Sequence, residues 1–178
     1  MIQNSAGPAA DDVLAAAQRL VRRETVVNLA VSAVLAAFVG WLIFRGDTAL
    51  VALAPPLGGV FGIVPGTFNF TLLVTLGLSM VIRKRVRAGA APLLDASHAG
   101  TRWARLPQPL SLRALTLAVL ATLTFVPLTL LLVRVAIGAG LLPAQWSFAG
   151  MLGFFVVYFV LLTWAVTPIV VWRALLDR

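Results

Sequence analysis

Asn69 is the polar side chain in this sequence best placed to bind something inside a membrane. It lies in an apolar stretch, Gly62 to Thr71, which reads GIVPGTFNFT and has Thr67 and Thr71 two positions on either side of the amide. An amide and two hydroxyls can hold a small polar solute or tie neighbouring helices together, and each costs free energy if it faces hydrocarbon unpaired. We therefore expect all three side chains to face the interior of a helical bundle, with Tyr158 as the first candidate partner of Asn69.

Two interpretations of the segment before Asn69 remain open. In the first, Thr48–Ala54 form a short interfacial helix, PPLGG is a turn, and Pro65 lies in the first turn of a spanning helix, where its missing N–H costs nothing. In the second, the segment from Ala54 to Gly66 is re-entrant, and its free carbonyls line a wet cavity together with Asn69. The first makes Asn69 a link between helices, and the second makes it part of a ligand site.

Groups suited to acid–base, nucleophilic or metal chemistry are scarce. The chain has no cysteine and one histidine, His98, which falls in a polar loop. All six acids lie at or beyond the ends of the apolar runs: Asp11, Asp12, Glu24, Asp47, Asp95 and Asp177. Coupled carriers usually need a carboxylate at membrane depth, and none of the usual catalytic constellations is present. We predict a protein that is not an enzyme and holds no cofactor or metal.

The composition identifies the elements that must position these side chains. Hydrophobic residues make up 61% of the 178 residues and charged residues 11%, against about 25% charged in soluble domains. Since a spanning helix needs about 20 apolar residues, we predict an all-α integral membrane protein forming one membrane domain, 1–178. Its predicted parts are an amphipathic helix (10–23), four transmembrane helices (26–44, 62–82, 112–137 and 150–171) and a basic cytoplasmic loop (83–111).

The distribution of Lys and Arg predicts the orientation. One side of the predicted membrane holds Arg45 and Arg134, and the other holds the remaining twelve basic residues: Arg19, Arg22, Arg23, Arg83, Lys84, Arg85, Arg87, Arg102, Arg105, Arg113, Arg173 and Arg178. Basic residues in short loops stay on the cytoplasmic side. We therefore expect both termini in the cytoplasm and the protein in a bacterial inner membrane. The formal net charge of +8 then requires no nucleic-acid partner.

Two groups of basic residues could bind anions. Arg83, Lys84, Arg85 and Arg87 follow the second predicted helix and suit anionic lipid headgroups on the cytoplasmic side. Arg45 and Arg134 each end an odd-numbered span. They either reach toward lipid phosphates or turn inward to hold an anionic headgroup or solute.

The two halves of the sequence share a hairpin plan. LAVSAVL at Leu29–Leu35 aligns with LAVLATL at Leu117–Leu123 at an offset of 88 residues, and NFTLLV at Asn69–Val74 aligns with YFVLLT at Tyr158–Thr163 at an offset of 89. A repeat of two spans keeps its orientation, so the halves would be related by an axis along the membrane normal. Two interpretations stay open: the halves form two similar helical hairpins, or the matches arise by chance because Leu, Ala and Val are so common in this sequence.

Two functions remain open at this stage. The first is an accessory, assembly or regulatory subunit that acts through helix–helix and lipid contacts. The second is a small permeation or lipid- and anion-handling protein that works as an oligomer, with a site near Asn69. Membrane lipids and another membrane protein, or further copies of this chain, are the expected partners.

The predicted topology can be tested by cysteine labelling, because the native chain contains no cysteine. Single cysteines at Ser97 and Gln145 should react with a membrane-impermeant reagent from opposite sides of the membrane. The first should be protected in intact cells, because it lies in the basic loop. Labelling of both positions from the same side would contradict the four-span topology.

Overall fold

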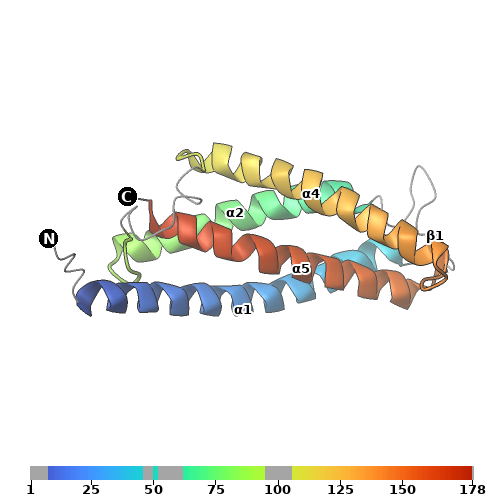
Figure 1. Cartoon of the computed structure of the whole chain (residues 1–178), viewed down its shortest axis with the longest axis horizontal. Helices are drawn as coiled ribbons and strands as arrows, with labels where there is room; N and C mark the ends of the chain where they lie inside the picture. Colours follow the sequence, from blue (N-terminus) through green and yellow to red (C-terminus); the bar gives the residue numbers. More distant parts are fainter. Residues whose placement is uncertain (1–7, 46–49, 52–61, 95–105, 178) are drawn as a thin grey trace, which may run out of the picture.

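The computed structural model describes residues 8–45, 50–51, 62–94 and 106–177. These residues form four long helices and one pair of two-residue strands: α1 (Pro8–Phe44), β1 (Leu50–Val51), α2 (Ile63–Arg87), α4 (Leu110–Gly138), β2 (Gln145–Trp146) and α5 (Phe148–Leu175). All four helices are long and apolar enough to cross a membrane. The predicted all-α membrane fold with four spanning helices is confirmed, and the helices form a bundle (Figure 1).

α1 is a single helix of 37 residues. The amphipathic segment predicted at 10–23 therefore continues without interruption into the predicted span at 26–44. At 1.5 Å per residue the helix is about 55 Å long, well beyond the hydrocarbon thickness of about 30 Å. Part of α1 must therefore project out of the hydrocarbon region.

α2 begins after Gly62 and places Pro65 in its first turn, as one of the two interpretations required. It continues past Ile82 to Arg87, so the first part of the predicted basic loop is helical. The chain then reverses at Gly89, whose φ of +71° favours a residue without a Cβ. The re-entrant alternative concerns residues 54–66, of which 54–61 lie outside the described residues, so it stays a prediction.

A short strand pair joins the two loops at the end of the bundle where α1 and α4 finish. β1 pairs antiparallel with β2, with Leu50 opposite Trp146 and Val51 opposite Gln145. The predicted helix over Thr48–Ala54 is therefore wrong at residues 50 and 51. We call this end of the bundle the β end.

The helices of one hairpin pack mainly on the helices of the other. α1 packs chiefly against α5 and α4 against α2, while α2 and α5 lie side by side and run in the same direction (Figure 1). Successive helices, α1 with α2 and α4 with α5, make few contacts. α5 is consequently the most enclosed helix. Of the residues in its most apolar 18-residue segment, 50% are buried, against 17% in the corresponding segment of α1.

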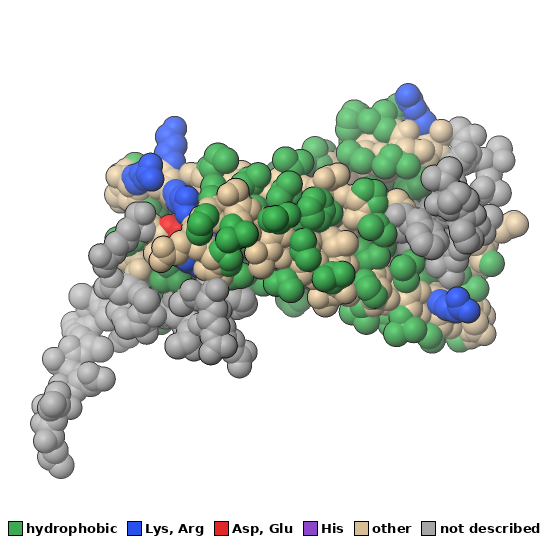
Figure 2. All heavy atoms as spheres, turned by 90° about the horizontal axis from the view of Figure 1, so that it is seen from above, with side chains coloured by type: hydrophobic (Ala, Val, Ile, Leu, Met, Phe, Trp, Pro, Cys, Tyr) green, Lys and Arg blue, Asp and Glu red, His purple; other side chains and the backbone are tan. Residues whose placement is uncertain are grey.

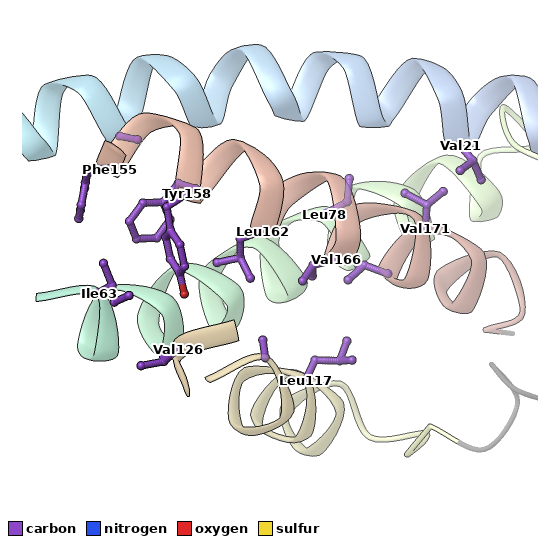
Figure 3. Close-up of a cluster of buried hydrophobic side chains, with 14 of the residues drawn as sticks. Val21, Ile63, Leu78, Leu117, Val126, Phe155, Tyr158, Leu162, Val166 and Val171 are labelled. Carbon is purple, nitrogen blue, oxygen red and sulfur yellow. The ribbon is translucent and has the colours of Figure 1, made fainter. Parts of the chain in front are cut away.

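The central pair of helices has matching buried faces. Adding 88 to the number of each buried residue of α2 gives a buried residue of α5: Ile63, Thr67, Thr71, Thr75, Leu78, Ser79 and Ile82 correspond to Met151, Phe155, Phe159, Thr163, Val166, Thr167 and Val170. The sequence alignment of the first and third predicted spans has this offset, whereas the second and fourth align at 89 residues, one residue away from the correspondence of the buried faces. The predicted pair of similar hairpins stays a prediction. Figure 3 shows part of this core, with Tyr158 of α5 directed toward α2, while Phe155 packs against Phe44 of α1.

Charged side chains mark both ends of the bundle. In Figure 2 the Lys and Arg side chains gather at the two ends, and hydrophobic side chains cover the visible surface between them. The start of α1, the end of α2, the start of α4 and the end of α5 share one end (Figure 1), which we call the basic end.

Gly40 sets the distance between α1 and α5. A Cβ at this position would lie 2.8 Å from Leu152 Cδ1 and 3.1 Å from Phe155 Cδ1. Gly40→Val should therefore destabilise the protein by about 1–3 kcal/mol through overpacking, measured as a lower thermal unfolding temperature in detergent. Gly77→Val is the matched control, because a Cβ at Gly77 meets nothing within 4 Å. Equal stability of the two variants would contradict the close approach.

Candidate functional site

A cluster of buried charges holds the basic end together. The Asp177 carboxylate accepts hydrogen bonds from Arg83 of α2, Arg113 of α4 and Arg173 of α5. Arg113 binds it in a bidentate manner, with Nη1 2.7 Å from Oδ2 and Nη2 2.9 Å from Oδ1. One carboxylate thus joins three helices, because bidentate Arg–carboxylate pairs fix geometry as well as charge.

Arg113 is fully buried, yet its guanidinium is well satisfied. Nε donates to the carbonyl of Pro107 (3.1 Å) and Nη2 donates to the carbonyl of Gln108 (3.0 Å), in addition to the carboxylate contacts. Burial by itself raises the pKa of Asp177, but hydrogen bonds from Arg113 and Arg83 and their positive charges outweigh it, so the pKa lies below its ordinary value. The cluster is an ionic lock with both carboxylate oxygens occupied, and it leaves no acceptor for a ligand.

A second ion pair lies at the same end and affects the predicted lipid site. Arg85 of α2 donates to the carboxylate of Glu24 on α1, which is 6% exposed. Arg83 is engaged by Asp177. Two of the four residues predicted to bind lipid headgroups therefore pair with carboxylates of the protein itself, while Lys84 and Arg87 are exposed. Headgroup binding by this group of residues stays a prediction.

A row of small polar residues runs along α2 at every fourth position. Thr67, Thr71, Thr75 and Ser79 are all fully buried, and Arg83 continues the same spacing into the ionic lock. Small residues at this spacing allow helices in membranes to approach closely. The Thr67 hydroxyl turns back to the carbonyl of the preceding turn, at Ile63. The other three hydroxyls of the row have no hydrogen-bond partner among the described residues. We interpret the row as a packing face of α2, and Thr67 and Thr71 face the interior as predicted.

Tyr158 is buried and pairs with Thr67. Its hydroxyl lies 2.6 Å from Thr67 Oγ1, and Thr67 uses its own proton on the carbonyl of Ile63, so Tyr158 is the donor. The predicted partnership of Tyr158 with Asn69 is therefore wrong. A second pair of hydroxyls links α1 to α5. Thr163 uses its own proton on the carbonyl of Phe159, so Ser32 donates to Thr163, with 2.6 Å between the two oxygens.

Asn69 faces outward, which contradicts the prediction that it points into the bundle. Its side chain is exposed and forms no hydrogen bond with another described residue. It lies two positions after Thr67, and two positions on a helix correspond to a turn of about 200°, so only one of the two can face α5.

The surface that carries Asn69 is an apolar groove of about 410 Å³ between α1 and α2, near the β end. Phe155 and Phe159 of α5 lie in the groove between the two helices. The wall residues are Leu35, Ala36, Val39 and Ile43 of α1 with Gly62, Pro65, Gly66, Asn69, Phe70 and Leu73 on the α2 side. We call it the Asn69 groove. Among the described lining residues, Asn69 alone has a side-chain group that can form hydrogen bonds.

Gly62 and Gly66 shape one end of this groove, and the sequence interpretation overlooked their four-residue spacing. A Cβ on Gly66 would lie 3.0 Å from Phe159 Cζ, while a Cβ on Gly62 meets nothing within 4 Å. Gly66 therefore lets the Phe159 ring pack against the α2 backbone, and Gly62 leaves the groove open. The GxxxG spacing was the available sequence signal for a helix contact here.

Arg45 and Arg134 both have exposed side chains at the β end. The Arg45 guanidinium carbon lies 4.9 Å from the centre of the Trp41 ring, within range of a cation–π contact. The predicted alternative in which both residues turn into the bundle is wrong. Their positions agree with side chains that reach along the surface toward lipid phosphates.

Comparison with known proteins finds no matching family model, no similar curated protein and no similar solved structure. Among the described residues, no three of the His, Asp and Glu side chains gather into a possible metal site. The functional argument therefore depends on the geometry of this chain.

The ionic lock predicts a specific acid sensitivity. Because the pKa of Asp177 is lowered on folding, its stabilisation is complete above the unfolded value of about 3.9 and is lost as the pH falls through the folded value. Asp177→Asn should lower the stability at pH 7 by about 3–5 kcal/mol, since it leaves buried guanidiniums unpaired. Because this variant has no carboxylate to protonate at position 177, its unfolding temperature should fall less than that of the native protein when the pH is lowered below 4.

Asp12→Asn is the control, because Asp12 is exposed near the start of α1. That variant should unfold like the native protein at pH 7. An Asp177→Asn variant as stable as the native protein at pH 7 would show that the lock is unnecessary.

Proposed function

We propose that this protein is a non-enzymatic accessory or assembly subunit of a bacterial inner membrane, and that it docks a transmembrane helix of a partner protein in the Asn69 groove. The observation that carries the proposal is the exposed amide of Asn69 in an otherwise apolar groove. An amide that faces hydrocarbon without a partner costs several kcal/mol by transfer from water to an alkane, on the order of 4–8 kcal/mol. A polar group of a docked helix would remove this cost.

The depth of Asn69 supports a helix as the occupant. Asn69 is seven residues after Gly62, so it lies about 10 Å along α2 from the start of that helix. A lipid acyl chain could fill the apolar groove at this depth but offers no hydrogen-bonding group. A helix that carries a Ser, Thr, Asn or Gln side chain supplies both the apolar surface and the acceptor or donor.

The form of the groove also suits a helix. Its two walls carry residues at intervals of three or four along nearly the same length of α1 and α2. Such rows form ridges that can receive the side-chain ridge of a third helix. Both walls include residues with little or no side chain: Ala36 on α1 and Gly62 and Gly66 on the α2 side. Such residues permit the close backbone approach common in membrane helix pairs.

The alternative function, permeation through a wet cavity at Asn69, has less support. Asn69 lies on the outside of the bundle, and the groove around it is lined by apolar side chains. The proposed orientation has both termini in the cytoplasm. It depends on the excess of Lys and Arg at the basic end, since such residues remain on the cytoplasmic side.

The proposal can be tested by site-specific photo-crosslinking in native membranes. A photoreactive residue at Leu73, on the wall of the groove, should capture a membrane protein through one of its spanning segments, identified by peptide mapping. Asn69→Leu should weaken this capture about 3- to 30-fold, the equivalent of 0.6–2 kcal/mol, without lowering the unfolding temperature.

Thr124→Val is the matched control, because Thr124 is an exposed polar residue on the membrane-facing surface of α4 and lines a different groove. It should leave capture unchanged. Capture of a second copy of this chain would show that the groove is occupied in a homo-oligomer and not by a different protein. Capture that is insensitive to Asn69→Leu would contradict the proposed role of the amide.

A further inference from the structure

A cleft at the basic end combines cationic and aromatic side chains and is separate from both the Asn69 groove and the ionic lock. It has a volume of about 550 Å³ and lies between α1 and α5. Its lining residues are Ala15, Gln18, Arg19, Val21, Arg22 and Trp172. We call it the Arg19–Arg22 cleft.

The two arginines of this cleft have no counterion among the described side chains. They lie three residues apart on one face of α1, where like charges repel. Neither forms an ion pair with a described carboxylate, and the Arg19 Nε reaches only the carbonyl of Ala15, at 3.3 Å. Glu24 is engaged by Arg85, and Asp177 by three other arginines. An anion from outside the chain would relieve the repulsion.

The depth of the cleft identifies the source of that anion. Trp41 and Arg22 are 19 residues apart on the same helix, about 28 Å at 1.5 Å per residue. This separation matches the hydrocarbon thickness of about 30 Å, so with Trp41 at one boundary Arg22 lies at the other. Trp172 lies in the cleft with it, and tryptophan favours the level of the lipid headgroups.

We propose that the Arg19–Arg22 cleft binds the phosphate headgroup of an anionic phospholipid in the inner leaflet. The guanidiniums of Arg19 and Arg22 donate to the phosphate oxygens, as Arg does in charge-assisted phosphate contacts. Gln18 is placed to contact the polar part of the headgroup. Val21 and Trp172 provide the apolar wall along which an acyl chain leaves the cleft.

This site differs from the basic run at the end of α2. There, Arg83 and Arg85 are engaged by Asp177 and Glu24, and of the four basic residues Lys84 and Arg87 are exposed; neither of them lines the Arg19–Arg22 cleft. The two places therefore present equal numbers of exposed charges at the same end of the bundle. Arg19 and Arg22 line this cleft with its aromatic wall, whereas Lys84 and Arg87 lie outside it, which allows a matched comparison.

The test uses the full-length protein in nanodiscs of phosphatidylcholine that contain a small fraction of phosphatidylglycerol, with lipid retention measured by native mass spectrometry. Arg19→Gln/Arg22→Gln should reduce the retained phosphatidylglycerol about tenfold, because it removes the charge-assisted contacts. Lys84→Gln/Arg87→Gln removes the same charge at residues outside the cleft and should reduce retention by a smaller factor than the first double variant does.

Four further outcomes decide the assignment. Trp172→Leu should weaken retention while leaving the net charge unchanged, which separates a formed cleft from general attraction. Equal losses in the two double variants, or no selective retention by the native protein, would overturn the site. Displacement of the lipid by millimolar inorganic phosphate would identify a soluble anion as the ligand and overturn the lipid assignment.

If Arg19→Gln/Arg22→Gln unfolds at a lower temperature than the native protein, retention of phosphatidylglycerol is measured with the single variant Arg22→Gln. Arg22 is exposed and forms no hydrogen bond with another described residue, so its loss should not affect folding. Unchanged lipid retention in this folded variant, together with unchanged retention in Trp172→Leu, would overturn the proposal.

Discussion

The contact between α2 and α5 is the interaction on which the rest of the structure depends. These two helices run in the same direction and bury faces that correspond at a constant offset of 88 residues. Thr67, in the buried row of small residues on α2, contacts Tyr158 of α5. Each outer helix packs on the central helix of the other hairpin. Because α1 packs on α5 and makes few contacts with α2, a groove remains open between α1 and α2.

Polar groups reinforce this arrangement at three levels of the bundle. The Tyr158–Thr67 pair joins the two central helices near the β end, and Ser32–Thr163 joins α1 to α5 further along. At the basic end the Asp177 carboxylate joins α2, α4 and α5. Side-chain hydrogen bonds between membrane helices contribute modestly each, so their distribution over all the helices matters more than any single pair.

The two proposed binding surfaces lie at opposite ends of α1. Both exist because α1 contacts the bundle along one face only and extends beyond the hydrocarbon region. The groove near the β end is apolar with one amide, which suits a helix within the membrane. The cleft at the basic end is cationic with an aromatic wall, which suits a lipid headgroup. An accessory subunit could thus hold a partner helix and a boundary lipid on the same helix without competition between them.

The sequence by itself determined the class of protein, the four spanning helices and the positions of most helix ends. Each of these follows from local quantities: the length of an apolar run, a proline in a first turn, or a cluster of basic residues after a span. Tertiary structure alone decided which face of α2 is buried. For this reason Tyr158 forms its hydrogen bond with Thr67 and not with Asn69. Tertiary structure also decided that Arg113 and Asp177, 64 residues apart, form a buried lock. The physical reason is that a helix with small polar residues on one face and an amide on another can bury either, and only packing against α5 selects between them.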